Sequence, residues 1–61
     1  MSFTAEEKRD CARREVSLRE RVYPEFIRSR RMTMRNAERQ IALMREIAED
    51  YDRLAEMNRL L

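Results

Sequence analysis

Glycine is absent from this 61-residue chain, and its one proline, Pro24, lies between two long stretches in which apolar residues recur at helical spacing. Glycine and proline are the residues that most often form tight turns, so a chain with so few of them has few places to reverse direction. Apolar residues three and four positions apart favour amphipathic helices. The sequence therefore predicts an all-α fold, a two-helix antiparallel hairpin that occupies residues 1–61 as a single domain.

A capping box is predicted at the start of the first helix, because Thr4 is followed three positions later by Glu7. The apolar positions that follow continue to Ile27 and predict a helix over about residues 5–30. Pro24 lacks the N–H group that a helix interior needs, and it predicts a kink near that position. A clean break, with a second segment starting at the proline, is the alternative.

The turn is predicted over residues 29–33, with Thr33 as the N-cap of a second helix from about Met34 to Met57 or beyond. No glycine stands at the end of the first helix, so Arg30 or Arg31 must adopt the left-handed conformation, or the turn must avoid it. Residues seven apart in the second helix predict a seam against another helix. One series is Ala37, Met44 and Tyr51, and the other is Ile47, Leu54 and Leu61.

Self-association is expected, because a chain of this length is close to the lower limit for burying enough apolar surface by itself. The apolar stripes of the two helices together are also wider than one hairpin can cover. We therefore expect a homodimer in which two hairpins form a four-helix bundle. The residues assigned to the core or the dimer contact are Val16, Ile27, Ile41, Met44, Ile47, Tyr51 and Leu54.

Charge is distributed unevenly along the chain. Residues 1–35 contain ten Lys or Arg and six Asp or Glu, a net charge of +4, whereas residues 36–61 contain four and six, a net charge of −2. Such a division favours attraction between the two helices, antiparallel packing of two copies, or binding of an acidic partner.

The densest cationic cluster surrounds the predicted turn and consists of Arg28, Arg30, Arg31 and Arg35. Guanidinium groups at this density bind acidic protein surfaces or nucleic-acid phosphates, although they also complement the helix dipole and keep a turn solvated. Two aromatic residues precede the cluster, and they either fill the core or anchor an interface. The candidate partner-binding residues are therefore the four arginines together with Tyr23 and Phe26.

The residues present give little support for catalytic chemistry. Histidine is absent and Cys11 is the one cysteine, which excludes a Cys/His zinc site, a Ser-His-Asp triad and a Cys-His dyad. Carboxylates at helical spacing, such as Glu46 and Asp50, are typical of a solvated helix face. We expect no enzyme activity, no cofactor and no metal. With one cysteine, no membrane-spanning apolar run and no signal segment, a cytoplasmic location and no membrane contact are expected.

Four segments carry a resemblance to a known group of proteins. They are Cys11–Val16, Arg21–Pro24, Arg31–Thr33 and the stretch from Ala37 to Tyr51. Together they resemble small helical proteins encoded by bacteriophages and prophages, whose functions are mostly unassigned. In that group a glycine precedes the Arg-Met-Thr turn, where this chain has Arg30. The resemblance implies a phage or prophage origin and the cytoplasm of a host cell, and it implies no catalytic residues.

These features predict a non-enzymatic, phage-type protein that binds a host or phage protein through a helical surface and inhibits or modulates it. The alternative is a small nucleic-acid-associated accessory protein that uses the arginine-rich tip. The tip lacks interleaved aromatic residues on which bases could stack, which favours the protein partner.

Overall fold

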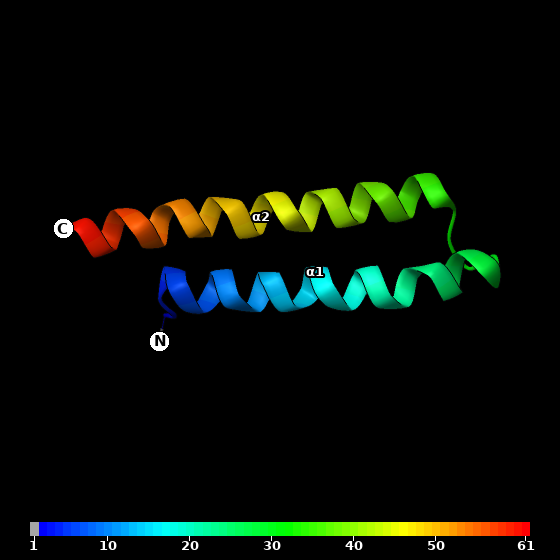
Figure 1. Cartoon of the computed structure of the whole chain (residues 1–61), viewed down its shortest axis with the longest axis horizontal. Coiled ribbons are helices and arrows are strands. Elements are labelled where there is room, and N and C mark those ends of the chain that lie inside the picture. The colour runs from blue at the N-terminus through cyan, green and yellow to red at the C-terminus, as the bar shows by residue number, and fades with distance from the viewer. Residues whose placement is uncertain (1) are drawn as a thin grey trace.

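The computed structural model describes residues 2–61 and consists of two antiparallel helices joined by a short turn (Figure 1). Helix α1 spans Ala5–Arg28 and helix α2 spans Met34–Leu60. The hairpin measures 47 × 20 × 17 Å. Helix α2 extends past the beginning of α1, so its last turns project from the open end of the hairpin (Figure 1). The predicted all-α helical hairpin is confirmed.

The capping box at the start of α1 is also confirmed. The backbone N–H of Glu7 donates to Thr4 Oγ1 at 3.0 Å, and the backbone N–H of Thr4 donates to Glu7 Oε1 at 3.1 Å. Each bond satisfies a donor that a helix start would otherwise leave free. Glu6 and Glu7 also place negative charge at the positive end of the helix dipole.

Helix α1 continues through Pro24 without interruption, so the continuous helix is confirmed and the clean break is wrong. The proline removes the donor that the carbonyl of Glu20 would normally bind one turn earlier. Pro24 and Glu20 are both exposed, so this carbonyl lies on the solvent side of the helix, where water can replace the missing donor.

A Schellman motif ends α1 two residues before the predicted boundary. The N–H of Arg31 donates to the carbonyl of Phe26 at 2.9 Å, and the N–H of Arg30 donates to the carbonyl of Ile27 at 3.1 Å. Arg30 has a φ of 63°, in the left-handed region. The motif needs that conformation at this position, where glycine is usual, so the alternative in which an arginine adopts it is confirmed.

The guanidinium carbon of Arg31 lies 5.9 Å from the centroid of the Phe26 ring. The two residues that flank a Schellman motif usually make an apolar contact, and here a cation over an aromatic face takes its place. Tyr23 lies next to Phe26, with ring centroids 6.0 Å apart. The side chains around the turn therefore hold the end of α1 together.

Helix α2 begins at the predicted N-cap. The N–H of Asn36 donates to Thr33 Oγ1 at 3.1 Å. The first turn of α2 contains no acidic residue and carries Arg35 instead, which leaves positive charge at the positive end of the helix dipole. At its other end α2 continues to Leu60, three residues past Met57.

The helices meet along a seam lined by small residues. The buried apolar residues are Ala5, Ala12, Ala37 and Ala48. Seam positions alternate at steps of four and three, which is the spacing of an antiparallel heptad contact. They are 5, 9, 12, 16, 19, 23 and 26 in α1, and 37, 41, 44, 48, 51 and 55 in α2. Alanine at five of these positions, four of them buried, lets the two backbones approach closely, and the larger apolar side chains remain half-buried beside them.

The two predicted heptad series behave differently. Ala37, Met44 and Tyr51 lie in the seam, where they are buried or half-buried. The series that begins at Ile47 lies outside the seam, since Leu54 is 42% exposed and Leu61 is 101% exposed. Successive helix residues are about 100° apart, so Ile47 points well away from the neighbouring seam residue Ala48.

Candidate protein-binding surface

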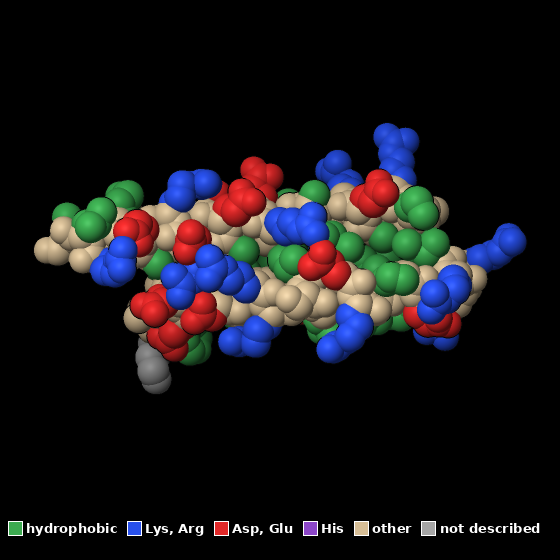
Figure 2. All heavy atoms as spheres, in the orientation of Figure 1, with side chains coloured by type: hydrophobic (Ala, Val, Ile, Leu, Met, Phe, Trp, Pro, Cys, Tyr) green, Lys and Arg blue, Asp and Glu red, His purple; other side chains and the backbone are tan. Residues whose placement is uncertain are grey.

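The four arginines assigned to partner binding lie at the turn end of the hairpin, where Figure 2 shows Lys and Arg side chains projecting into solvent. We call this set, Arg28, Arg30, Arg31 and Arg35, the arginine tip. All four are exposed. The turn itself positions them, because the left-handed residue at the end of α1 redirects the chain just before α2 starts.

Each arginine of the tip has a different environment. Arg28 pairs with Glu25 one turn earlier in α1. Arg31 covers the Phe26 ring. Within residues 2–61, Arg30 and Arg35 make no ion pair. These two guanidinium groups therefore keep their full charge toward solvent.

The aromatic residues assigned to this surface are half-buried. Both occupy seam positions at the end of α1, and the guanidinium group of Arg31 lies over the Phe26 ring. Next to them, a shallow open hollow is lined by Ile27, Arg30, Arg31, Met32, Thr33, Met34 and Asn36. The tip thus combines cationic groups with apolar and methionine side chains on one continuous surface.

The residues assigned to the core or dimer contact separate into two groups. Val16, Ile27, Ile41, Met44, Ile47 and Tyr51 are half-buried, whereas Leu54 is exposed. They do not form one face, because Val16, Ile41, Met44 and Tyr51 lie in the seam and the other three lie outside it. The seam leaves two long sides of different character.

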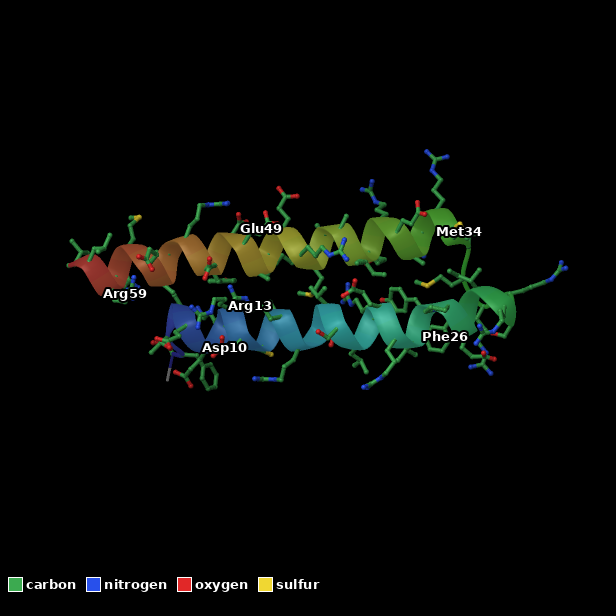
Figure 3. All side chains as sticks on the ribbon, in the orientation of Figure 1. Asp10, Arg13, Phe26, Met34, Glu49 and Arg59 are labelled. Atoms are coloured by element: carbon green, nitrogen blue, oxygen red, sulfur yellow. The ribbon has the colours of Figure 1, made fainter. Side chains whose placement is uncertain are left out.

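One side is crossed by ion pairs, and we call it the ion-paired flank. Asp52 of α2 accepts from Arg9 at 3.4 Å and from Arg13 at 3.2 Å, and Figure 3 shows Arg13 reaching from α1 toward α2. Further along, Arg45 of α2 donates to Glu20 of α1 at 2.5 Å. Figure 2 views this side, with basic and acidic side chains meeting across the two helices.

On the ion-paired flank, Arg9 pairs with three carboxylates, those of Glu6, Asp10 and Asp52. Its Nε donates to Asp10 Oδ1 at 3.0 Å, and this hydrogen bond raises the pKa of Arg9 above its ordinary value. Arg9 occupies a seam position, as does Arg19, whose Nη1 donates to the carbonyl of Gln40 at 2.9 Å. Sequence reasoning missed both arginines, although their heptad spacing with Ala5 and Ala12 was the available signal.

The opposite side is apolar, and we call it the apolar flank: Cys11, Leu18, Val22, Leu43, Ile47 and Leu54. An open hollow on this side is lined from both helices, including Cys11 of α1 and Ile47 of α2. Here the described residues form no ion pair between the helices. Sequence reasoning did not assign Cys11, Leu18, Val22 or Leu43 to a site. The available signal was the spacing of seven that places Cys11 and Leu18 on one line of α1.

Among residues 2–61, no three His, Cys, Asp or Glu side chains are grouped so that they could hold a metal ion. In the same range, neither helix contains an apolar stretch long enough to cross a lipid bilayer.

Comparison with known proteins adds no relatives. The chain matches no family model, and neither the curated proteins nor the solved structures include one that is similar to it. The resemblance to phage-encoded proteins therefore stays a prediction.

Proposed function

We propose that this protein is a non-enzymatic, phage-type binding protein that contacts an acidic surface of a host or phage protein through its arginine tip, and thereby inhibits or modulates that protein in the host cytoplasm. The observation that carries the proposal is that, among the described residues, three of the four tip arginines make no ion pair, whereas six of the ten other basic side chains do. The phage origin and the host setting come from the resemblance of the four short segments.

The distribution of ion pairs supports the tip as the contact. Seven of the fourteen basic side chains are paired with carboxylates along the helices, including Arg45 with Glu20. At the tip, Arg28 alone has such a partner among the described residues. A guanidinium group without an internal carboxylate can bind an external one in a bidentate manner, and it is worth more once the contact excludes water.

A protein partner is favoured over nucleic acid by the state of the aromatic rings. Single-stranded nucleic acid is usually held by bases stacked on exposed ring faces. The guanidinium group of Arg31 lies over Phe26, and Tyr23 is half-buried in the seam. One face of Phe26 is therefore covered by a guanidinium group and Tyr23 is partly enclosed by the seam, whereas the methionines at the turn suit an adaptable protein contact.

The test is quantitative capture from a lysate of phage-infected or prophage-carrying bacteria, with the full chain as bait. The bait variant Arg30→Asn with Arg35→Gln removes two tip charges that make no ion pair among the described residues, and asparagine tolerates the left-handed conformation at position 30. We expect a captured protein with an acidic surface to decrease about tenfold or more with this variant.

A matched control removes the same charge elsewhere. Arg14→Gln with Arg21→Gln takes two exposed arginines from the outer face of α1, and we expect capture to be unchanged. Equal loss with both variants would indicate a nonspecific charge effect and contradict the proposal. Capture that disappears after nuclease treatment, together with tip-dependent retardation of a duplex or single-stranded DNA probe, would support the nucleic-acid alternative.

A further inference from the structure

The hairpin exposes more surface than a compact protein of its mass. Its accessible surface is 5280 Å² for 7.5 kDa, whereas a compact monomer of that mass exposes about 4,200 Å². The excess is about 1,000 Å², close to the roughly 800 Å² that each partner buries in a protein interface of standard size. The four buried residues are alanines, so the larger apolar side chains lack cover that a second molecule could supply.

The apolar flank is where this cover is missing. Leu18 is 42% exposed, Leu43 is 50% exposed and Leu54 is 42% exposed. At about 100° per residue, all three fall on the same side of the seam as Cys11 and Ile47. Arg14 and Arg21 border Leu18 on its outer side and are exposed, whereas charged side chains nearer the seam make contacts within the chain. Arg19 pairs with Glu15 at 2.9 Å, and Lys8 lies 5.4 Å from the centroid of the Tyr51 ring. An apolar surface formed by leucines of both helices fits a copy of itself.

Charge along the hairpin axis selects the orientation of that copy. The turn-side half, residues 19–44, contains seven Lys or Arg and three Asp or Glu, a net charge of +4. The open half, residues 1–18 and 45–61, contains seven and nine, a net charge of −2. Each molecule therefore has a positive end and a negative end, separated along its 47 Å axis.

We propose that the apolar flank binds a second copy of this chain, in an antiparallel homodimer whose two-fold axis crosses the flank near Leu18 and Leu43. Two arrangements with two-fold symmetry bring flank against flank. In the parallel one the two +4 halves face each other, whereas in the antiparallel one each +4 half faces a −2 half. Opposite charge across the contact favours the antiparallel arrangement.

The inference is independent of the proposed function, because the arginine tip and the apolar flank are different surfaces. In the antiparallel dimer the two tips lie at opposite ends of the four-helix bundle and remain free. Two partner proteins could then bind at once without touching the dimer contact. In the parallel dimer the tips would be adjacent and their charges would repel.

Sedimentation equilibrium of the full chain tests the surface. We expect twice the chain mass of 7.5 kDa at micromolar concentration. The variant Leu18→Gln with Leu43→Gln keeps both helices but should sediment as a monomer, with a dissociation constant raised at least about a hundredfold. The matched control Leu60→Gln changes an exposed leucine outside the flank and should remain dimeric. A monomer at all concentrations, or a double variant as dimeric as the parent, would overturn the proposal.

Orientation is tested separately, on a chain whose leucines are unchanged. The variant Cys11→Ser with Ser29→Cys carries one thiol at the tip for a spin label. Ser29 is eleven residues from Leu18 in sequence, so at the helical rise of 1.5 Å per residue the antiparallel dimer should separate the labels by about 30–40 Å. The parallel dimer should place them within about 20 Å.

The label separation also tests the dimer if the variant Leu18→Gln with Leu43→Gln unfolds. If the labels are about 30–40 Å apart in a species of twice the chain mass, the antiparallel dimer is supported without that variant. A label separation within about 20 Å overturns the proposed orientation. If the labels show no interaction and the protein has the mass of a monomer, the dimer is overturned. The apolar flank would then be a contact for a different protein.

Discussion

Arg30 adopts a backbone conformation that its residue type disfavours. Its φ of 63° lies in a region that costs a side chain with a β-carbon roughly 1–2 kcal/mol. The motif around it is nevertheless complete, because Arg31 and Arg30 donate to the carbonyls of Phe26 and Ile27. An arginine at a glycine position gives up stability while keeping a cation at the tip, which is consistent with a binding role.

Replacing Arg30 with glycine should therefore stabilise the protein. We expect Arg30→Gly to raise the free energy of unfolding by about 0.5–1 kcal/mol, because the strain at positive φ exceeds the added freedom of the unfolded chain. Urea unfolding followed by circular dichroism measures the change.

The control for that substitution removes the same side chain from a helix interior. Arg39→Gly lies on an exposed turn of α2 and should lower the free energy of unfolding by about 1 kcal/mol. If both glycine variants were destabilised equally, the left-handed backbone at position 30 would not be a source of strain.

At the scale of the helices, the seam depends on small side chains. Ala37 is 1% exposed and Ala48 is 6% exposed, and no large side chain is fully buried in the part of the chain that is described. The backbones are therefore close, and little space remains for additional atoms. The ion-paired flank adds contacts between α1 and α2, because Asp52 pairs with two arginines of the other helix.

Enlarging a seam alanine should force the helices apart. We expect Ala37→Leu to lower the free energy of unfolding by about 1–3 kcal/mol through overpacking. Ala42→Leu makes the same change at an exposed position of the same helix and should stay within about 0.5 kcal/mol of the parent. Urea unfolding at one fixed protein concentration compares the two variants. A stabilised Ala37→Leu variant would show that the seam contains unfilled space.

At the scale of the whole molecule, the separation of charge along the axis matters more than the net charge of +2. The positive half contains the arginine tip, and the negative half contains the open ends of both helices. Exposed charges separated by more than about 8–10 Å are largely screened at physiological salt, so this polarity acts mainly on molecules that come into contact.

Changing the charge of one half should shift the proposed dimer in a direction set by the sign. Arg53→Gln with Arg59→Gln makes the open half more negative and should tighten association about two- to fivefold at low salt. Arg30→Asn with Arg35→Gln makes the turn half less positive and should weaken association by a similar factor. Sedimentation equilibrium at about 0.02 M and about 0.5 M salt measures both. Shifts of the same sign, or shifts that persist at high salt, would contradict an electrostatic choice of orientation.

Local rules in the sequence were sufficient for the elements. The capping box at Thr4, the N-cap at Thr33 and the alternation of apolar and charged residues depend on contacts within one or two helical turns. For that reason the two helices, their approximate bounds and the hairpin were predictable. The candidate arginine tip was found in the same way, because a run of charges around a turn is visible in the sequence itself.

Tertiary structure decided everything that depends on how one helix faces the other. It placed Ala37, Met44 and Tyr51 in the seam and left Leu54 outside it, although both heptad series look alike in the sequence. It also distinguished an ion-paired flank from an apolar one, by bringing Asp52 to Arg13 across 39 residues of chain. Rotation and register of packed helices follow from the fit of two surfaces, and no single stretch of sequence contains both of them.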